Sequence, residues 1–551
     1  MGTQSATARI SQLVGNSDES VEAFPWWKRG VIYQIYPRSF QDGNGDGTGD
    51  LPGILLRLDY LSWLGVDAIW LSPVYPSPMV DFGYDVADYC DIDPLFGTLA
   101  DFDRLVAQAH ARGIRVLLDW VPNHTSDRHP WFVASRSSRD DPKRDWYIWR
   151  DPGPDGGPPS NWLNYSGNSA WKWDERTGQY YYRIFTDQQP DLNWRNPEVQ
   201  EAMYETLRFW LRRGVDGFRI DVLSLLVEDD ELRDNPPNPD YRPEVDFPFM
   251  REISVYHVDR PETRELVRHI RKVVDEFGDD KVLLAELVLP LDQTVAYYGD
   301  NGDGVQVPFN FELLSADWDA RGLADYIDRY LAALPPGGWP NWVVGNHDTP
   351  RVATRLGPAR ARVAAMLLLT LPGTPTLYYG DEIGQRDAEI PPAQLRDPIA
   401  ALIPGRGRDP ERAPMQWSAG PAAGFTTGEP WLPPAADHET VTVEAQRDDP
   451  ASMLSLHRRL LALRRRAPAF VTSSYEPVQA DGDVLAYVRS GGGERWLVAL
   501  NLGAHSGRLA PPGVRLAGRV ELSTHPERDG DAVDGELTLR GDEGLVVRLD
   551  T

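Results

Sequence analysis

The 551-residue chain predicts an α/β protein built on a (β/α)8 barrel, with an insertion after the third strand and a C-terminal antiparallel β-sandwich. About eight short apolar runs alternate with helix-length amphipathic segments, which is typical of repeated βαβ units on a parallel sheet. Eight such units are the number that closes a barrel. After residue 472 the pattern changes to short strands separated by Gly and Asp turns, which indicates a separate antiparallel domain.

The first half of the barrel follows in order along the chain. Strands are predicted in VIYQIYP (31–37), DAIWLSPVY (67–75) and IRVLLDWVPNH (114–124), and helices at 51–64 and 99–112 alternate with them. These runs are apolar along their whole length, as expected for strands that are buried on both faces of a parallel sheet.

The alternation stops after the third strand. Residues 125–196 are rich in Trp, Tyr, Gly, Pro and Asp, and we expect an irregular insertion there that lies over the barrel mouth. A helix at 197–214 and a strand at 215–222 resume the rhythm. Further strands are predicted at 282–287, 305–311, 342–346 and 374–379.

These patterns divide the chain into four parts. Residues 1–24 form a polar tail without the apolar segment of a signal peptide. The barrel takes residues 25–124 and 197–471, the insertion takes 125–196, and the β-domain takes 472–551.

Composition restricts the function. A net charge of −27 argues against nucleic acid or an anionic membrane as a partner, and no apolar run is long enough to predict a membrane span. The only cysteine, Cys90, cannot form an internal disulfide and fits a reducing compartment. We therefore expect a cytoplasmic enzyme, a monomer or small homo-oligomer, that acts on a small neutral molecule.

The stretch GVDGFRIDV (214–222) ends a predicted buried strand with one charge of each sign. Arg219 and Asp221 are two residues apart, so their side chains point to the same face of the strand. The permanent cation favours the ionised form of Asp221, as a carboxylate nucleophile requires. A structural ion pair would have the same pattern, so this stretch alone leaves both interpretations open.

Two further strand ends carry acids. The fifth strand ends at Glu286, and the seventh ends with His347 and Asp348, while Asp119, Asn123 and His124 close the third. The carboxyl ends of barrel strands meet on one rim, so three acids from three strands should lie close together. Because like charges resist sharing a site, one of them should have a raised pKa. A pair of carboxyls with unlike pKa values is the apparatus that cleaves glycosidic bonds.

Six short motifs follow one another along the chain: GYDVADY (83–89), DWVPNH (119–124), QPDLNW (189–194), GFRIDV (217–222), AE (285–286) and VGNHDTPR (344–351). The second, fourth, fifth and sixth resemble the four signature regions of one enzyme family, glycoside hydrolase family 13 (the α-amylase family), and the other two resemble its additional regions. DGNGDGTGDL (42–51) and RAPMQW (412–417) resemble the oligo-1,6-glucosidase and α-glucosidase branch. The resemblance covers roughly residues 25–551 and implies a (β/α)8 barrel, a domain B after strand three and a β-sandwich domain C.

The resemblance implies roles for individual residues. Asp221 matches the nucleophile, Glu286 the general acid/base and Asp348 the third acid, which stabilises the transition state. Asp85 matches the acid that recognises the non-reducing end, with Arg408 as its expected partner and Arg412 as the alternative. The remaining residues implied around the glucose pocket are Tyr84, as a stacking platform, His124, Phe185, Gln189, Arg219 and His347.

The loop at 42–50 predicts a separate cation site. Asp42, Asn44, Asp46 and Asp50 alternate with glycines, which places oxygen ligands at the spacing that a hard cation needs. The loop lacks the Glu of an EF-hand, and a plain Gly/Asp turn is the alternative. The resemblance implies Ca²⁺ or Mg²⁺ with Thr48 contributing its carbonyl oxygen, and no organic cofactor.

The expected function is a retaining, exo-acting α-glucosidase on short maltose- or isomaltose-type oligosaccharides and sucrose, with transglucosylation and an Asp221–Glu286 carboxyl separation of about 5–5.5 Å. The linkage stays open: Val222 matches a position where valine accompanies α-1,6 preference, but it also fits simple packing. The alternative is a glucosyltransferase or isomerase of the trehalose synthase or sucrose isomerase type. A non-catalytic relative, such as the ectodomain of an amino-acid-transporter heavy chain, would need a lost acid and a membrane span.

Overall fold

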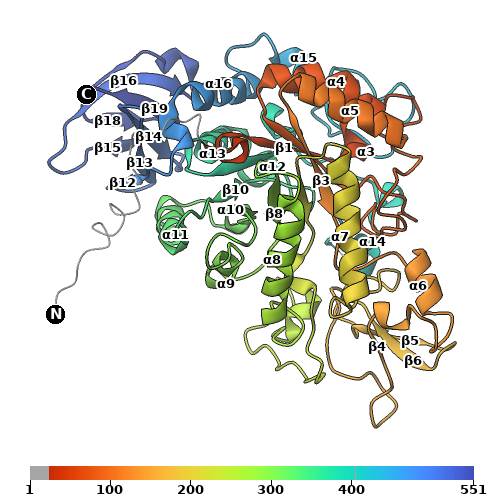
Figure 1. Ribbon diagram of the computed structural model, residues 1–551. Coiled ribbons are helices and arrows are strands. Elements are labelled where there is room, and N and C mark those ends of the chain that lie inside the picture. Colours follow the sequence, from red (N-terminus) through yellow and green to blue (C-terminus); the bar gives the residue numbers. More distant parts are fainter. Residues whose placement is uncertain (1–23, 404, 551) are drawn as a thin grey trace, which may run out of the picture.

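The computed structural model describes residues 24–403 and 405–550 (Figure 1). The predicted polar tail, residues 1–24, lies outside this part of the chain except for Phe24.

A TIM barrel forms the centre of the molecule, as predicted. Its strands follow the order β10-β11-β1-β2-β3-β7-β8-β9, and every neighbouring pair is parallel. The strands are β1 (Ile32–Ile35), β2 (Ala68–Leu71), β3 (Arg115–Trp120), β7 (Gly217–Ile220), β8 (Val282–Ala285), β9 (Val307–Pro308), β10 (Asn341–Val343) and β11 (Thr374–Tyr378).

The barrel has one unpaired seam, between β9 and β10, within the described residues. β9 is only two residues long and ends on Pro308, which has no N–H to donate to a neighbouring strand. The sequence predicted a longer strand at 305–311, so proline shortens this element. Phe309 and Phe311 follow it with their rings stacked at 5.4 Å between centroids.

Helices surround the strands, and caps fix where they begin. Asp50 accepts the amide hydrogen of Gly53 at the start of α4, and Thr98 forms a capping box with Asp101 at the start of α5. The outer helices are α4 (Leu51–Leu64), α5 (Leu99–Ala111), α7 (Pro197–Arg212), α8 (Pro261–Asp275), α11 (Ala320–Ala333), α13 (Pro358–Thr370) and α16 (Met453–Arg466).

The insertion after β3 contains more regular structure than the irregular segment predicted. It holds α6 (Pro130–Ser135) and an antiparallel sheet of β4 (Trp149–Arg150), β6 (Gln179–Tyr182) and β5 (Trp171–Asp174). Gly178 has a φ of 64° and allows the chain to turn between β5 and β6. Figure 1 shows this sheet on the far side of α7 from the C-terminal domain.

The C-terminal domain is antiparallel, as predicted. Its main sheet has the order β12-β13-β14-β19-β16-β17, and β15 pairs with β18. The strands are β12 (Glu476–Val478), β13 (Val484–Gly491), β14 (Glu494–Asn501), β15 (Gly507–Leu509), β16 (Leu516–Ser523), β17 (Ala532–Gly535), β18 (Leu537–Leu539) and β19 (Gly544–Leu549).

Within the described residues, none of the helices combines the length and the apolar character that a membrane crossing needs.

Candidate active site

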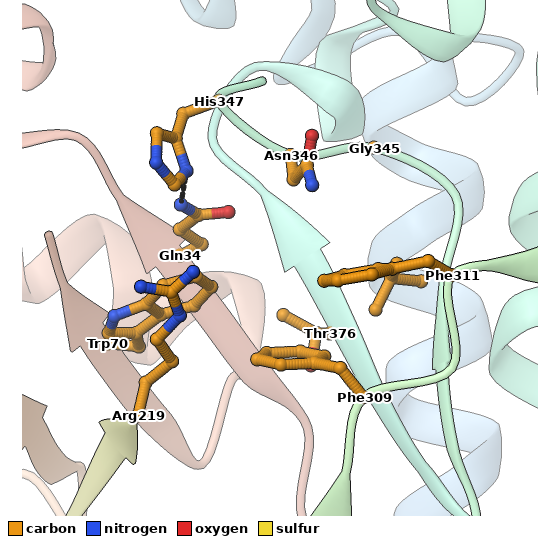
Figure 2. A pocket seen from close by; sticks show the side chains of 10 residues that line it. Gln34, Trp70, Arg219, Phe309, Phe311, Gly345, Asn346, His347 and Thr376 are labelled. Carbon is orange, nitrogen blue, oxygen red and sulfur yellow. Dashed lines mark hydrogen bonds between the residues drawn. The ribbon is translucent and has the colours of Figure 1, made fainter. Parts of the chain in front are cut away.

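The carboxyl ends of β3, β7 and β8 bring three acids around one arginine. Arg219 lies 2.7 Å from Asp119 and 2.5 Å from Asp221 through Nη1, and 2.6 Å from Glu286 through Nη2. The guanidinium is buried and lies over Trp70, 5.2 Å from the ring centroid (Figure 2). Four neighbouring strands therefore meet at one buried cation.

Burial sets the protonation of this cluster. Desolvation raises the pKa of Glu286 to about 8; Arg219 opposes this rise, while the charges of Asp221 and Asp348 add to it. Desolvation also raises the pKa of Asp221, to about 7, against the pull of Arg219. One guanidinium cannot neutralise three carboxylates, so the cluster keeps a proton near neutral pH. Glu286 has the higher pKa and holds it, which leaves Asp221 ionised.

Val222 forms the sharp turn that follows Asp221. Its φ of 37° and ψ of 45° are left-handed, a conformation that a β-branched residue rarely adopts. In this conformation its amide donates a hydrogen bond to Glu286 Oε2 at 3.1 Å, and the amide of Leu223 donates to the Glu286 carbonyl at 3.2 Å. The turn after Asp221 therefore also fixes the position of Glu286.

Asp348 has a different environment from Glu286. It pairs with Arg412 Nη2 at 2.8 Å and Arg408 Nη1 at 3.2 Å, and its carboxyl lies 3.2 Å from His347 Nε2. Desolvation alone would raise the pKa of Asp348, but the permanent charges of Arg408 and Arg412 outweigh it and lower that pKa well below its usual range. Asp348 is therefore an anion throughout the physiological pH range.

The two predicted histidines are buried and neutral. Gln34 Nε2 donates to His347 Nδ1 at 2.7 Å, as Figure 2 shows, and Tyr84 contacts His347 Nε2 at 2.8 Å and stacks on its ring. Desolvation lowers the pKa of His347 to about 3 and that of His124 to about 4. Neutral imidazoles suit binding of sugar hydroxyls rather than proton transfer near neutral pH.

Domain B contributes to the wall beside His124. Gln189 Nε2 lies 3.1 Å from His124 Nε2, and the Phe185 ring packs edge-on against the same imidazole at 5.1 Å between centroids. The structure thus brings Tyr84, His124, Phe185 and Gln189 together, as the sequence predicted.

The predicted pairing of Asp85 with Arg408 or Arg412 is wrong. Asp85 is fully buried, and its carboxylate accepts hydrogen bonds from Ser77 Oγ and the amides of Val80 and Asp81 at 2.8–2.9 Å. Its oxygens are therefore occupied by its own loop.

Asp81 takes the place predicted for Asp85. Arg408 Nη2 contacts Asp81 Oδ1 at 2.7 Å and also pairs with Asp397, while Gln189 Nε2 donates to Asp81 Oδ2 at 3.2 Å. Sequence reasoning missed Asp81, although it lies only four residues before Asp85 in the same loop.

Tyr165 of domain B was also missed. Its ring lies beside Phe185, which packs on His124, and burial raises the pKa of its hydroxyl with the charge of Asp348 adding to the rise. Its ring contacts Phe185 at 6.2 Å and Phe249 at 5.4 Å between centroids. The aromatic composition of the insertion was the only available signal.

The loop at 42–50 folds around its own carboxylates. Asp42 accepts amide hydrogens from Asn44, Gly45 and Gly47 at 2.7–2.9 Å, and Asp50 accepts those of Gly43 and Gly53. Asn44 Oδ1 bonds the amide of Asp46, and Asp46 Oδ1 bonds that of Thr48, both at 2.8 Å.

The same loop carries uncompensated negative charge. Burial raises the pKa of Asp50 to about 6, and the charges of Asp42 and Asp46 add to the rise. Within residues 24–403 and 405–550, no group of three or more His, Cys, Asp or Glu side chains converges as a metal site. A cation here would therefore also need the oxygens of Asn44 and Thr48. Donors that are all oxygen suit Ca²⁺ or Mg²⁺.

Comparison with known proteins agrees with this geometry. Residues 34–473 match the α-amylase catalytic domain. A probable α-glucosidase of Rhizobium meliloti (strain 1021) is 43% identical over 514 residues, 89% of this chain and 92% of that protein. An oligo-1,6-glucosidase of Parageobacillus thermoglucosidasius is 38% identical over 515 residues, 86% of this chain and 90% of that protein.

Solved structures are similar over nearly the whole chain. The α-glucosyl transfer enzyme XgtA superposes with a TM-score of 0.90 at 43% identity and covers 96% of this chain and 100% of its own. The trehalulose synthase MutB from Pseudomonas mesoacidophila MX-45 gives a TM-score of 0.87 at 34% identity, with 96% and 100% coverage. The chain is a glycoside hydrolase that belongs to the α-amylase family, glycoside hydrolase family 13, in its α-glucosidase branch.

Proposed function

We propose that this enzyme is a retaining, exo-acting α-glucosidase that releases α-glucose from the non-reducing end of short α-glucosides. The observation that carries the proposal is the pair Asp221 and Glu286 around Arg219, with one retained proton and unlike pKa values. A carboxylate and a carboxylic acid at one buried centre are what double displacement requires.

The two carboxyls act in sequence. Protonated Glu286 donates its proton to the leaving oxygen while ionised Asp221 attacks the anomeric carbon and forms a β-glucosyl-enzyme. Glu286, now a base, takes a proton from water, which displaces Asp221 and gives α-glucose. Asp348 stays ionised and binds sugar hydroxyls, and its charge favours the developing oxocarbenium ion.

Exo action follows from Arg408. Its guanidinium contacts both Asp81, in the loop after β2, and Asp348, after β10. Arg408 thereby joins the loop after β2 to the loop after β10 at the pocket that holds the glucose. The polar groups of Asp81 and Arg408 can then bind the hydroxyls of a terminal glucose. An internal glucose residue of a longer chain has no free 4-hydroxyl to offer them.

Transfer is the second candidate function. XgtA and MutB are named for glucosyl transfer and trehalulose synthesis, and both superpose on nearly the whole chain. A panel of maltose, isomaltose, sucrose and trehalose, with product analysis, separates the outcomes. Free glucose supports hydrolysis, whereas trehalose or a sucrose isomer as main product supports a transferase or isomerase. The ratio of maltose to isomaltose turnover, measured also for Val222→Ala, assigns the linkage.

Azide rescue tests the assignment of the two carboxyls. Glu286→Ala should retain formation of the glucosyl-enzyme on p-nitrophenyl α-glucoside, because that leaving group needs no proton. Azide should then attack the β-linked intermediate and give α-glucosyl azide. Asp221→Ala should lose turnover by about 10³-fold or more with the fold unchanged. A β-azide product from Glu286→Ala, or appreciable hydrolysis by Asp221→Ala, would contradict the mechanism.

We also propose that the loop at 42–50 binds Ca²⁺ or Mg²⁺ in a structural role. Asp42, Asn44, Asp46 and Asp50 would supply side-chain oxygens and Thr48 its carbonyl oxygen. The uncompensated charge at Asp50 supports this assignment. The cation would stabilise the loop that precedes α4, at a distance from the reacting atoms.

A cytoplasmic location remains our proposal. The single cysteine, Cys90, is compatible with a reducing compartment. Cell fractionation would test this proposal: α-glucosidase activity should be found in the cytoplasmic fraction and not in the other fractions.

A further inference from the structure

We propose that Arg38 is a positioning residue that holds Asp81 in place for the terminal glucose. This inference rests on the proposed role of Asp81 as the acid that recognises the non-reducing end. It assigns a function to a half-buried arginine that the reaction itself does not use.

The loop that carries Asp81 has a strained backbone. Met79 has a φ of 63° and Phe82 a φ of 47°, so residues on both sides of Asp81 are left-handed without being glycine. Such a conformation is disfavoured for residues other than glycine and persists only where neighbouring structure holds it. Asp85 holds the loop from inside, through the amides of Val80 and Asp81.

Arg38 holds the two left-handed residues from outside. Its Nη2 donates to Met79 Sδ at 3.2 Å, and its guanidinium lies 5.1 Å from the centroid of the Phe82 ring. Arg38 is half-buried, and its Nε has no hydrogen-bond partner within the described part of the chain. The charge of Asp93 favours the cationic form of Arg38, but the guanidinium itself lies against the two left-handed residues of the Asp81 loop.

Trp431 completes the support. Its ring packs edge-on against Phe82 at 5.5 Å between centroids, and its indole centroid is 5.2 Å from the Arg38 guanidinium. The indole N–H donates to Ser39 Oγ at 3.0 Å, and the Trp431 amide donates to the Gly47 carbonyl at 2.9 Å. Arg38 is thus held between the Asp81 loop and the 42–50 loop.

The test is a double-mutant cycle on p-nitrophenyl α-glucoside. Arg38→Lys keeps the charge but loses the planar group that spans Met79 and Phe82. We expect it to raise KM about tenfold, since the recognition contact is misplaced, with kcat within about twofold. Asp81→Asn should raise KM at least as much, and Arg38→Lys should have no further effect on KM in that background.

Arg57→Lys is the matched control. Arg57 also lies over a tryptophan, Trp417, at 4.0 Å and donates to Gln41, but it does not touch the Asp81 loop. It should leave KM unchanged. Thermal melting and glucose inhibition constants, measured for all variants, separate misfolding from misplacement, and Arg38→Met provides a second substitution if Arg38→Lys does not fold.

Two results would overturn the inference, and they are distinguishable. Arg38 does not act through Asp81 if Asp81→Asn raises KM while Arg38→Lys leaves KM unchanged. The same conclusion follows if the effects of the two substitutions on KM are fully additive in the double mutant. If Asp81→Asn itself leaves KM unchanged, the proposed recognition of the non-reducing end by Asp81 fails first.

Discussion

At the catalytic centre, the Glu286 carboxyl lies 2.6 Å from Arg219 and accepts the amide hydrogen of Val222 at 3.1 Å. Both contacts favour its ionised form, yet desolvation outweighs them and raises the pKa of Glu286. Ionisation of Glu286 therefore costs more free energy in the folded protein than in the unfolded chain. The catalytic role proposed for Glu286 is therefore in conflict with the stability of the fold.

The conflict predicts a pH-dependent stability difference for Glu286→Gln. The pKa of Glu286 rises from its ordinary value of 4.5 to about 8 in the folded protein, so the stability that this group contributes falls as pH rises between these values. The glutamine variant lacks this fall. It should match the wild type near pH 4.5 and be more stable above pH 8, by on the order of a few kcal/mol.

Urea unfolding at a series of pH values measures this difference. Glu265→Gln, on the exposed face of α8, is the control and should run parallel to the wild type. Parallel curves for Glu286→Gln as well would show that burial does not raise the pKa of Glu286.

Single residues also show where sequence reasoning reaches its limit. Asp221, Glu286 and Asp348 could be predicted to meet because strand ends of a barrel share one rim. Asp81 and Asp85 lie in one irregular loop, where no periodicity tells which carboxylate faces the pocket. The burial of Asp85 and the exposure of Asp81 to Arg408 depend on left-handed turns at Met79 and Phe82 that the sequence does not announce.

At the scale of elements, Asp50 has two functions. It caps the N-terminus of α4 through the Gly53 amide at 2.6 Å, and it closes the 42–50 loop through the Gly43 amide at 3.1 Å. A neutral acceptor would satisfy both bonds, whereas a bound cation needs the charge.

Two substitutions of Asp50 separate the cap from the cation. Asp50→Asn should keep most of the stability in EDTA but lose the rise in melting temperature that Ca²⁺ or Mg²⁺ gives the wild type. Asp50→Ala should lose both, with about 1 kcal/mol attributable to the cap. Calorimetric melting with and without each ion measures this. Equal stabilisation of the wild type and Asp50→Asn by the ions would remove Asp50 from the proposed site.

The helices and strands differ in how well the sequence predicts them. The strands from β1 to β8 that belong to the barrel lie within the predicted apolar runs because burial on both faces leaves a continuous signal. The β5–β6 hairpin was missed because it is short and aromatic, and its turn from Asp174 to Gly178 lies among many other turn residues. β9 is shorter than predicted because Pro308 ends the pairing.

At the scale of the whole molecule, the largest hydrophobic cluster extends from the barrel into the C-terminal domain, which also has a cluster of its own. Leu485, Tyr487 and Val546 of that domain belong to the same buried cluster as barrel residues of α13 and α16. Buried Arg489 joins the two parts, because it donates to the backbone carbonyls of Thr370, Thr472 and Ser474.

Arg489→Met should therefore destabilise the interface between the two domains. The buried carbonyl of Thr370 and the half-buried carbonyls of Thr472 and Ser474 lose their donor, at a cost of about 1–3 kcal/mol. We expect the melting temperature to fall in calorimetry, while KM on p-nitrophenyl α-glucoside stays unchanged because the pocket is remote. Arg495→Met, on an exposed position of β14, is the control. An unchanged melting temperature would show that Arg489 does not stabilise this interface.

The order of the domains could be predicted because each has its own sequence pattern. The barrel strands are continuous apolar runs separated by helices, whereas the C-terminal domain has short strands separated by tight turns. The hydrophobic cluster that the barrel shares with this domain could not be predicted, because residues such as Thr370 and Tyr487, whose hydroxyls lie 2.6 Å apart, are distant in the sequence.

The arginines of the pocket leave an excess of negative charge. Asp119, Asp221 and Glu286 share Arg219, while Asp81, Asp348 and Asp397 share Arg408 and Arg412. Even with Glu286 protonated, carboxylates outnumber guanidiniums. A small hydroxylated amine carries its own positive charge into this imbalance and can form the same hydrogen bonds as glucose. Such amines should therefore inhibit competitively with substrate. Rising ionic strength should weaken the binding of the amines more than it weakens the binding of glucose.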